Sequence, residues 1–200
     1  MGKYSKFRNI VVLGIVLFLS LVLSVGLANA GGDGYISFKL DGKVYKFSDG
    51  PLAFFVPDDE TPHTILGALD ISADKFILIS FEGNSRGTYF INPSDLFNQI
   101  HYYEGKDGWI AIGSFGEGKI KVTRYGHIGG YITGKFSGKL TGELTGSQGV
   151  KQISGSFKIK RISDLDESFK SALDNDEITN KFHFLKHIIE EAAKSAKGMD

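Results

Sequence analysis

Residues 132–147 alternate two kinds of side chain without interruption. One parity reads Ile132, Gly134, Phe136, Gly138, Leu140, Gly142, Leu144 and Gly146, and the other parity is polar throughout. Successive side chains of a β-strand point to opposite faces. The stretch therefore predicts an extended chain with one polar face and one face on which bulky residues alternate with bare backbone.

Residues 153–157 repeat the pattern of residues 132–136, and the segment from Gly146 to Gly149 can turn the chain between them. We therefore expect a long hairpin. The bare positions have two interpretations. Large residues of a facing strand, sheet or helix fill them, as in a tapered barrel, or the exposed backbone leaves room for a ligand. Packing is the interpretation that we favour.

Shorter runs before this hairpin have the length and composition of strands, and clusters of Gly, Asp, Asn and Pro separate them. They are residues 35–40, 44–48, 52–56, 64–71, 75–82, 88–91, 99–104, 109–115 and 119–125. The connection Asp41-Gly42-Lys43 is typical of a tight hairpin. The sequence predicts a mainly β chain that forms an antiparallel β-sandwich or barrel-like domain.

Residues 1–30 have the pattern of a signal peptide, with an apolar run after three basic residues and with Ala28 and Ala30 at the positions that a signal peptidase reads. The same run is close to the length of an uncleaved membrane anchor. The chain has no cysteine, so no disulfide can brace an exported domain. We expect a secreted or extracytoplasmic protein that contacts the membrane only if this segment is retained.

Composition changes near Ser163. The turn-rich region, predicted as a β domain over residues 31–162, is followed by a segment in which Gly198 is the only glycine. Apolar residues recur there at the helical period, which predicts a C-terminal helical segment over residues 163–200, packed on the β domain.

The charges of the full chain balance, with 23 basic and 23 acidic residues. Loss of the three basic residues of the leader would leave 20 against 23, a net charge near −3. Nucleic acid is not an expected partner, because its binding usually leaves a basic footprint.

Two motifs could carry chemistry, and each has a plainer interpretation. The segment from Gly83 to Gly87 matches the string of a nucleophile elbow around Ser85, but predicted strands on both sides favour a hairpin loop. His183 and His187 have the spacing of zinc ligands, yet they lie on the polar face of a predicted helix. We predict no catalytic residue, no metal site and no cofactor.

Tyr103, Trp109 and Tyr125 are the candidate binding residues, because they fall on what look like consecutive strands. On one exposed face they would form a flat platform for a sugar ring or an apolar ligand. Aromatic packing between strands inside the domain explains the same residues and is the favoured interpretation.

The chain resembles a group of uncharacterised secreted or lipoprotein β-domains of bacterial envelopes. Three short segments carry the resemblance: Leu40 to Tyr45, Ile132 to Gly138 and Ile153 to Ile159. The resemblance covers roughly residues 35–161. It implies a β-sandwich or barrel-like fold and no catalytic residues. Many members carry a lipid-bearing cysteine, which this chain lacks.

These observations predict an exported, non-enzymatic binding or envelope-structural domain. Its partner would be an unknown surface partner, a glycan or a small apolar ligand. The alternative is a β-barrel carrier that holds a small apolar ligand, and a secreted hydrolase is the third hypothesis.

Overall fold

A computed structural model describes residues 34–48, 51–57, 61–70, 72–94, 96–142 and 145–164. The described chain is mainly β, and its strands belong to one compact unit, residues 29–165. Among these residues no helix is long and apolar enough to cross a membrane. The predicted signal peptide, with Ala28 and Ala30, and the predicted helical segment beyond residue 164 lie outside the described residues.

Eleven strands form one mixed sheet in the order β2-β1-β11-β3-β4-β5-β7-β8-β10-β9-β6. Their bounds are β1 Tyr35–Leu40, β2 Lys43–Phe47, β3 Leu52–Val56, β4 His63–Asp70, β5 Lys75–Glu82, β6 Gly87–Ile91, β7 Gln99–Glu104, β8 Asp107–Ile112, β9 Glu117–Arg124, β10 Tyr131–Thr141 and β11 Val150–Asp164.

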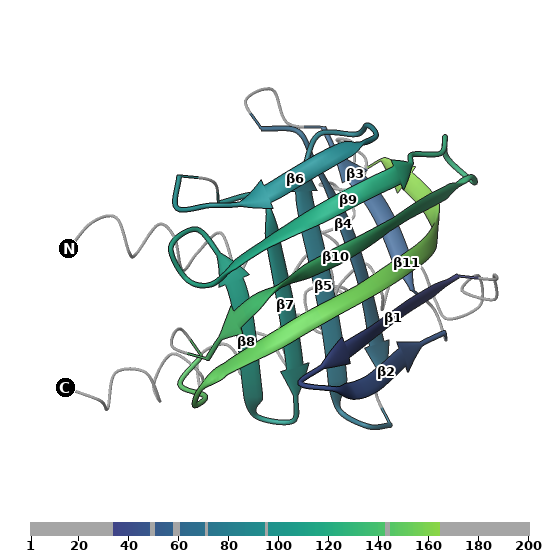
Figure 1. Ribbon diagram of the computed structural model, residues 1–200. Coiled ribbons are helices and arrows are strands. Elements are labelled where there is room, and N and C mark those ends of the chain that lie inside the picture. Colours follow the sequence, from purple (N-terminus) through teal and green to yellow (C-terminus); the bar gives the residue numbers. More distant parts are fainter. Residues whose placement is uncertain are drawn as a thin grey trace, which may run out of the picture. The chain divides into compact units, whose positions relative to one another are not determined.

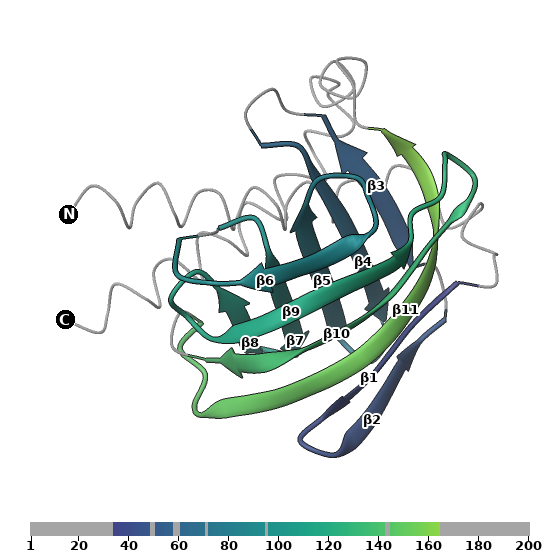
Figure 2. The same cartoon turned by 45° about the horizontal axis from the view of Figure 1, so that its top comes forward.

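The sheet folds over itself into two layers (Figures 1 and 2). The front layer contains β2, β1, β11, β10, β9 and β6, and it runs obliquely across the back layer of β3, β4, β5, β7 and β8. The strand β11 joins the layers, because it pairs with β1 and β10 in front and its end pairs with β3 behind. At the other end of the hairpin, Thr141 of β10 pairs with Ile110 of β8.

Every predicted strand is present, and the long hairpin is confirmed by a continuous register from Tyr131↔Lys160 to Thr141↔Val150. Two details of the prediction were wrong. The extended stretch ends at Thr141 instead of continuing to residue 147. One pairing is parallel, because the end of β11 lies beside β3, and these added hydrogen bonds carry the strand to Asp164, past the predicted boundary at residue 162.

Phenylalanine rings fill the bare positions of the hairpin, as the packing interpretation predicted. Gly134 pairs with Phe157, and Phe136 pairs with Gly155. A Cβ on Gly134 would lie 2.5 Å from the ring of Phe157, and a Cβ on Gly155 would lie 2.7 Å from the ring of Phe136 and 2.5 Å from the Cβ of Phe38. The rings of Phe136 and Phe157 stack with their centroids 6.4 Å apart. The glycines therefore make room for neighbouring rings.

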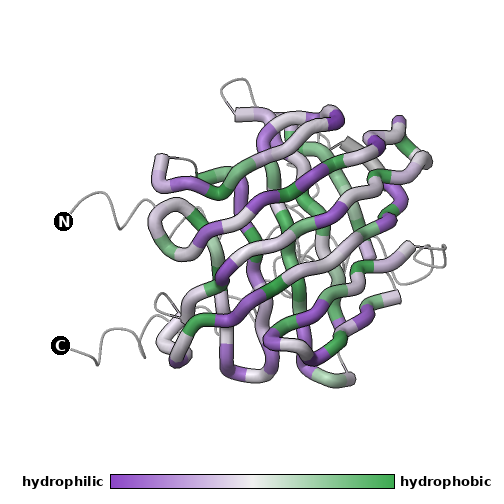
Figure 3. The backbone as a smooth tube through the Cα atoms, viewed as in Figure 1, coloured by the Kyte–Doolittle hydropathy of each residue, from purple (hydrophilic) through white to green (hydrophobic). Residues whose placement is uncertain are grey.

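The two layers differ in how they bury their residues. Along β9, β10 and β11, buried apolar side chains alternate with polar ones, whereas longer apolar stretches follow the strands of the back layer (Figure 3). In β5, Ile77 and Ile79 belong to the core between the layers, and Leu78 and Ser80 on the opposite face are also buried. This difference leaves the outward side of the front layer as a polar surface.

We expect Gly155→Ala to lower the free energy of unfolding by about 1–3 kcal/mol, because its methyl group would overlap the side chains of Phe38 and Phe136. Gly87→Ala is the control, because a Cβ there meets only the Tyr89 side chain, at 3.4 Å or more. Urea denaturation of both variants measures the difference. Equal stabilities would contradict the packing described for the hairpin.

His101 is fully buried in the back layer, where its Nε2 lies 2.6 Å from Oε1 of Gln99. Burial lowers the pKa of His101 to about 3. The unfolded chain binds a proton here below about pH 6.5, while the folded chain stays neutral. Stability should therefore fall by about 2 kcal/mol between pH 6.5 and pH 5 from this group. Denaturation across this range should show a shallower fall for His101→Phe, and parallel curves would contradict the assignment.

Candidate functional site

The structure does not bring the three predicted binding residues together. Trp109 pairs with Tyr102 across β7 and β8, and its ring stacks on that of Tyr102 at 6.4 Å, against the core. Tyr103 follows Tyr102 in β7 and so points to the opposite face, where its ring lies 6.1 Å from Phe76. Tyr103 and Trp109 therefore cannot form one platform.

Tyr125 also packs against the core, at the opposite end of β5 from the β7–β8 turn. Its ring meets Phe81 edge-on at 6.4 Å, and its hydroxyl lies 2.8 Å from Oγ1 of Thr64. The guanidinium of Arg161 lies 5.2 Å from the ring centroid. Trp109 and Tyr125 are thus partly buried and pack against the core at separate places.

Ser85 lies in the loop between β5 and β6. The strand β6 follows it, so the strand-to-helix context of a nucleophile elbow is absent, as the sequence predicted. The loop is not a hairpin, because β6 pairs with β9 in the front layer and not with β5. Ser85 is engaged by Tyr89, whose hydroxyl donates to the Ser85 carbonyl at 2.8 Å and lies 3.3 Å from its Oγ.

His183 and His187 lie outside the described residues. Within the part of the chain that the structure describes, no group of three His, Cys, Asp or Glu side chains could hold a metal ion.

The outward surface of the front layer gathers like charges from five of its strands. Its lysines are Lys39, Lys46, Lys119, Lys121, Lys135, Lys139, Lys158 and Lys160. Among the described outward positions of the six strands, Glu117 is the one acidic residue, and it is paired with Lys139 at 2.5 Å. Serines lie between the lysines: Ser37, Ser137, Ser154 and Ser156. We call this surface the lysine–serine face.

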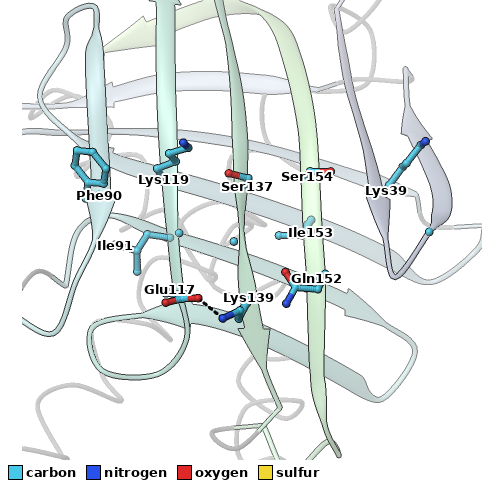
Figure 4. Close-up of a pocket in the computed structure, with 13 residues that line it drawn as sticks. Lys39, Phe90, Ile91, Glu117, Lys119, Ser137, Lys139, Gln152, Ile153 and Ser154 are labelled. Atoms are coloured by element: carbon cyan, nitrogen blue, oxygen red, sulfur yellow. Dashed lines mark ion pairs between the residues drawn. The ribbon is translucent and has the colours of Figure 1, made fainter.

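The register places these residues in rows across the strands. One row runs Lys39–Ser154–Ser137–Lys119, and the next runs Ser37–Ser156–Lys135–Lys121. Figure 4 shows the first row, with a lysine at each end and the serines between them. Three strand spacings separate the backbones of Lys39 and Lys119, about 14 Å. The first row lines two adjoining hollows that are open to solvent, and the second row lines one of them.

Lys121 and Lys135 stand directly opposite each other on β9 and β10. Like charges in this position destabilise a sheet. Neither ammonium group has a carboxylate partner among the described residues, and the same holds for Lys39 and Lys119. Lys158 differs, because its Nζ lies 4.5 Å from the ring centroid of Tyr131. Four ammonium groups at the hollows are thus available to an anion.

Sequence reasoning missed this face. The alternation in residues 132–147 predicted a polar side for one strand, and the balanced total charge gave no sign of a basic surface. The lysines of β1 and β9 come beside those of β10 only through strand pairing.

A second polar cluster joins β2 of the front layer to β5 and β7 of the back layer. The hydroxyls of Tyr45 and Tyr102 donate to Oε2 of Glu104, each at 3.0 Å. The Nζ atoms of Lys43 and Lys75 lie 3.7 and 3.5 Å from its Oε1. Burial acts to raise the pKa of Glu104, but the hydrogen bonds from Tyr102 and Tyr45 and the two lysine charges lower it below its ordinary value. The carboxylate is fully engaged, which indicates a structural role.

Comparisons with models of protein families, with curated proteins and with solved structures found no match for this chain.

We expect Glu104→Gln to lower the free energy of unfolding at pH 7 relative to the wild type. Because the pKa of Glu104 is lowered in the folded state, its stabilisation is present above the unfolded value and is lost as the pH falls through the folded one. The difference between the two proteins should therefore shrink in acid. Glu82→Gln, which removes an exposed carboxylate, is the control. A difference of the same size at pH 7 and pH 3, measured by urea denaturation, would contradict this role.

Proposed function

We propose that this protein is an exported, non-enzymatic binding module of the cell envelope or exterior, and that its lysine–serine face binds an acidic polysaccharide. The observation that carries the proposal is the juxtaposition of Lys121 and Lys135, with Lys39 and Lys119 nearby and no carboxylate partner for any of the four among the described residues. Two opposed lysines lower the stability of the sheet when no ligand is bound. A bound anion would offset the repulsion between their charges, which explains why the pair is present.

The shape of the face favours a long ligand that lies on the surface. The two hollows adjoin, share Lys39, Lys119, Ser137 and Ser154, and open to solvent. Small serine side chains form the floor, and lysines stand on either side of it. A polymer chain can rest on such a floor while several of its charges meet lysines.

The residues at the hollows favour a glycan over nucleic acid. Serine hydroxyls both donate and accept hydrogen bonds, as sugar hydroxyls do. Binding of single-stranded nucleic acid relies on aromatic side chains that stack on the bases. Phe90, at the margin of one hollow, is the one aromatic side chain at an outward position among the residues that line the two hollows.

The sequence supports the rest of the proposal. The leader pattern in residues 1–30 favours export, and the resemblance to envelope β-domains favours a barrel-like or sandwich-like binding module without catalytic residues. The carrier of a small apolar ligand has less support, because rings of neighbouring strands occupy the space beside Gly134 and Gly155 that it would use.

The test is binding of polygalacturonate to the full chain, measured by calorimetry at two salt concentrations. We expect binding that weakens with salt. Lys121→Gln/Lys135→Gln should bind about tenfold more weakly, a loss of about 1.4 kcal/mol. It should be at least as stable as the wild type, because two opposed charges are gone. Lys106→Gln, in the exposed β7–β8 turn, is the control and should bind like the wild type.

Inorganic polyphosphate, neutral dextran and single-stranded DNA are the comparison ligands. Binding of polyphosphate as well would show that the face selects charge without regard to the anionic group. Dextran binding as tight as that of polygalacturonate would contradict the charge argument, and tighter binding of DNA would contradict the choice of a glycan.

A further inference from the structure

The two outermost strands of the front layer differ in how their free edges are covered. On β6, the Phe90 carbonyl accepts hydrogen bonds from Nδ2 of Asn98 at 3.2 Å and of Asn92 at 3.3 Å. Asn98 is buried, and its Oδ1 accepts the N–H of Glu82 at 2.9 Å, which ties β6 to β5. By contrast, among the described strands β2 pairs only with β1, and it is the outermost strand in both views (Figures 1 and 2).

The turn before β2 decides which of its backbone groups face outward. Asp41 and Gly42 have φ values of 48° and 86°, as a two-residue type I′ hairpin requires. The residues that flank such a turn, Leu40 and Lys43, exchange hydrogen bonds, and the pairs then alternate along the strands. Every second residue of β2 after Lys43 therefore also faces β1.

Val44 and Lys46 occupy the other parity, so their N–H and C=O groups point away from β1. Among the described residues, these four groups have no hydrogen-bond partner. The edge of β2 is thus open to another strand.

The side chains along this edge are apolar and basic. Val44 is 62% exposed, and Lys43 and Lys46 are exposed on either side of it in the sequence. Lys39, which pairs with Val44 in β1, adds a further positive charge on the outward side. Lys43 itself lies on the face of Tyr45, where it is paired with Glu104, so a partner strand would meet one apolar side chain beside Lys39 and Lys46.

We infer that β2 accepts an extended acidic peptide segment as an added strand. The backbone of the segment pairs with Val44 and Lys46, and its carboxylates lie near the lysines. A second copy of this chain is a poorer partner, because antiparallel pairing of two β2 strands would bring Lys46 of one copy close to Lys46 of the other on the same face.

The probe is a capped ten-residue peptide of alternating Glu and Val, titrated into the full chain. We expect binding, followed by NMR, with the amide shifts of Val44 and Lys46 changing most. Val44→Pro should weaken binding at least tenfold, because proline removes the outward N–H while every lysine is kept. The β1–β2 ladder does not use that N–H, so the hairpin should persist.

Two controls separate strand pairing from attraction by charge. The same peptide with N-methyl groups on alternate residues keeps its charge and should lose binding to the wild type, which decides the question even if Val44→Pro fails to fold. Lys121→Gln/Lys135→Gln should bind the peptide as the wild type does, because both lysines lie on β9 and β10, away from β2, so this inference and the proposed function can fail separately.

The inference is overturned if the wild type binds the methylated peptide as tightly as the unmethylated one. It is also overturned if folded Val44→Pro binds the unmethylated peptide as tightly as the wild type does. In either case charge alone would explain the affinity. An absence of peptide binding at millimolar concentration would overturn it as well. It would mean that the lysines of β2 protect the edge from pairing, as lysines on edge strands often do.

Discussion

The described sheet depends on the fit between phenylalanine rings and bare glycine backbone where β1, β11 and β10 run side by side. Phe136 and Phe157 each stand opposite a glycine on the neighbouring strand, and a Cβ at Gly134 or Gly155 would overlap a ring. Because the rings fill the space beside the glycines, the inward side of the front layer is packed without gaps there, and β10 and β11 stay paired over their whole length. That length allows β11 to reach β3 and join the two layers.

The same strands carry the packing on one parity and the charges on the other. Phenylalanine, isoleucine and glycine face inward along β10 and β11, and lysine and serine face outward. The core is therefore complete without the outward side chains. The opposed pair Lys121 and Lys135 is compatible with a stable fold, because its cost in stability falls on the surface and leaves the interior packing unchanged.

Polar clusters connect the layers in two places where the sheet order provides no strand pairing. Glu104, held by Tyr45 and Tyr102, links β2 to β7, and Asn98 links β5 to β6. These ties hold the two margins of the front layer in different ways. Asn98 occupies the free edge of β6, whereas Glu104 contacts side chains of β2 and leaves the backbone edge of that strand open.

Much of the fold could be predicted from the sequence, because the direction of a side chain in a strand alternates locally. The bounds of β3, β5 and β7 follow from short apolar runs between turn residues, and the match of glycine to phenylalanine is visible in the repeat of residues 132–136 at 153–157. The same alternation predicted that one side of β10 is polar.

Only the tertiary structure decided which strands are neighbours, since pairing joins residues far apart in the chain. No local pattern shows that β11 pairs with β3 in parallel or that β6 pairs with β9 instead of β5. Nor does one show that Tyr103 and Trp109 point to opposite faces. The lysine–serine face has the same origin. By itself the sequence determined a balanced charge and a set of alternating strands, and long-range register then gathered Lys39, Lys119 and Lys121 on one surface.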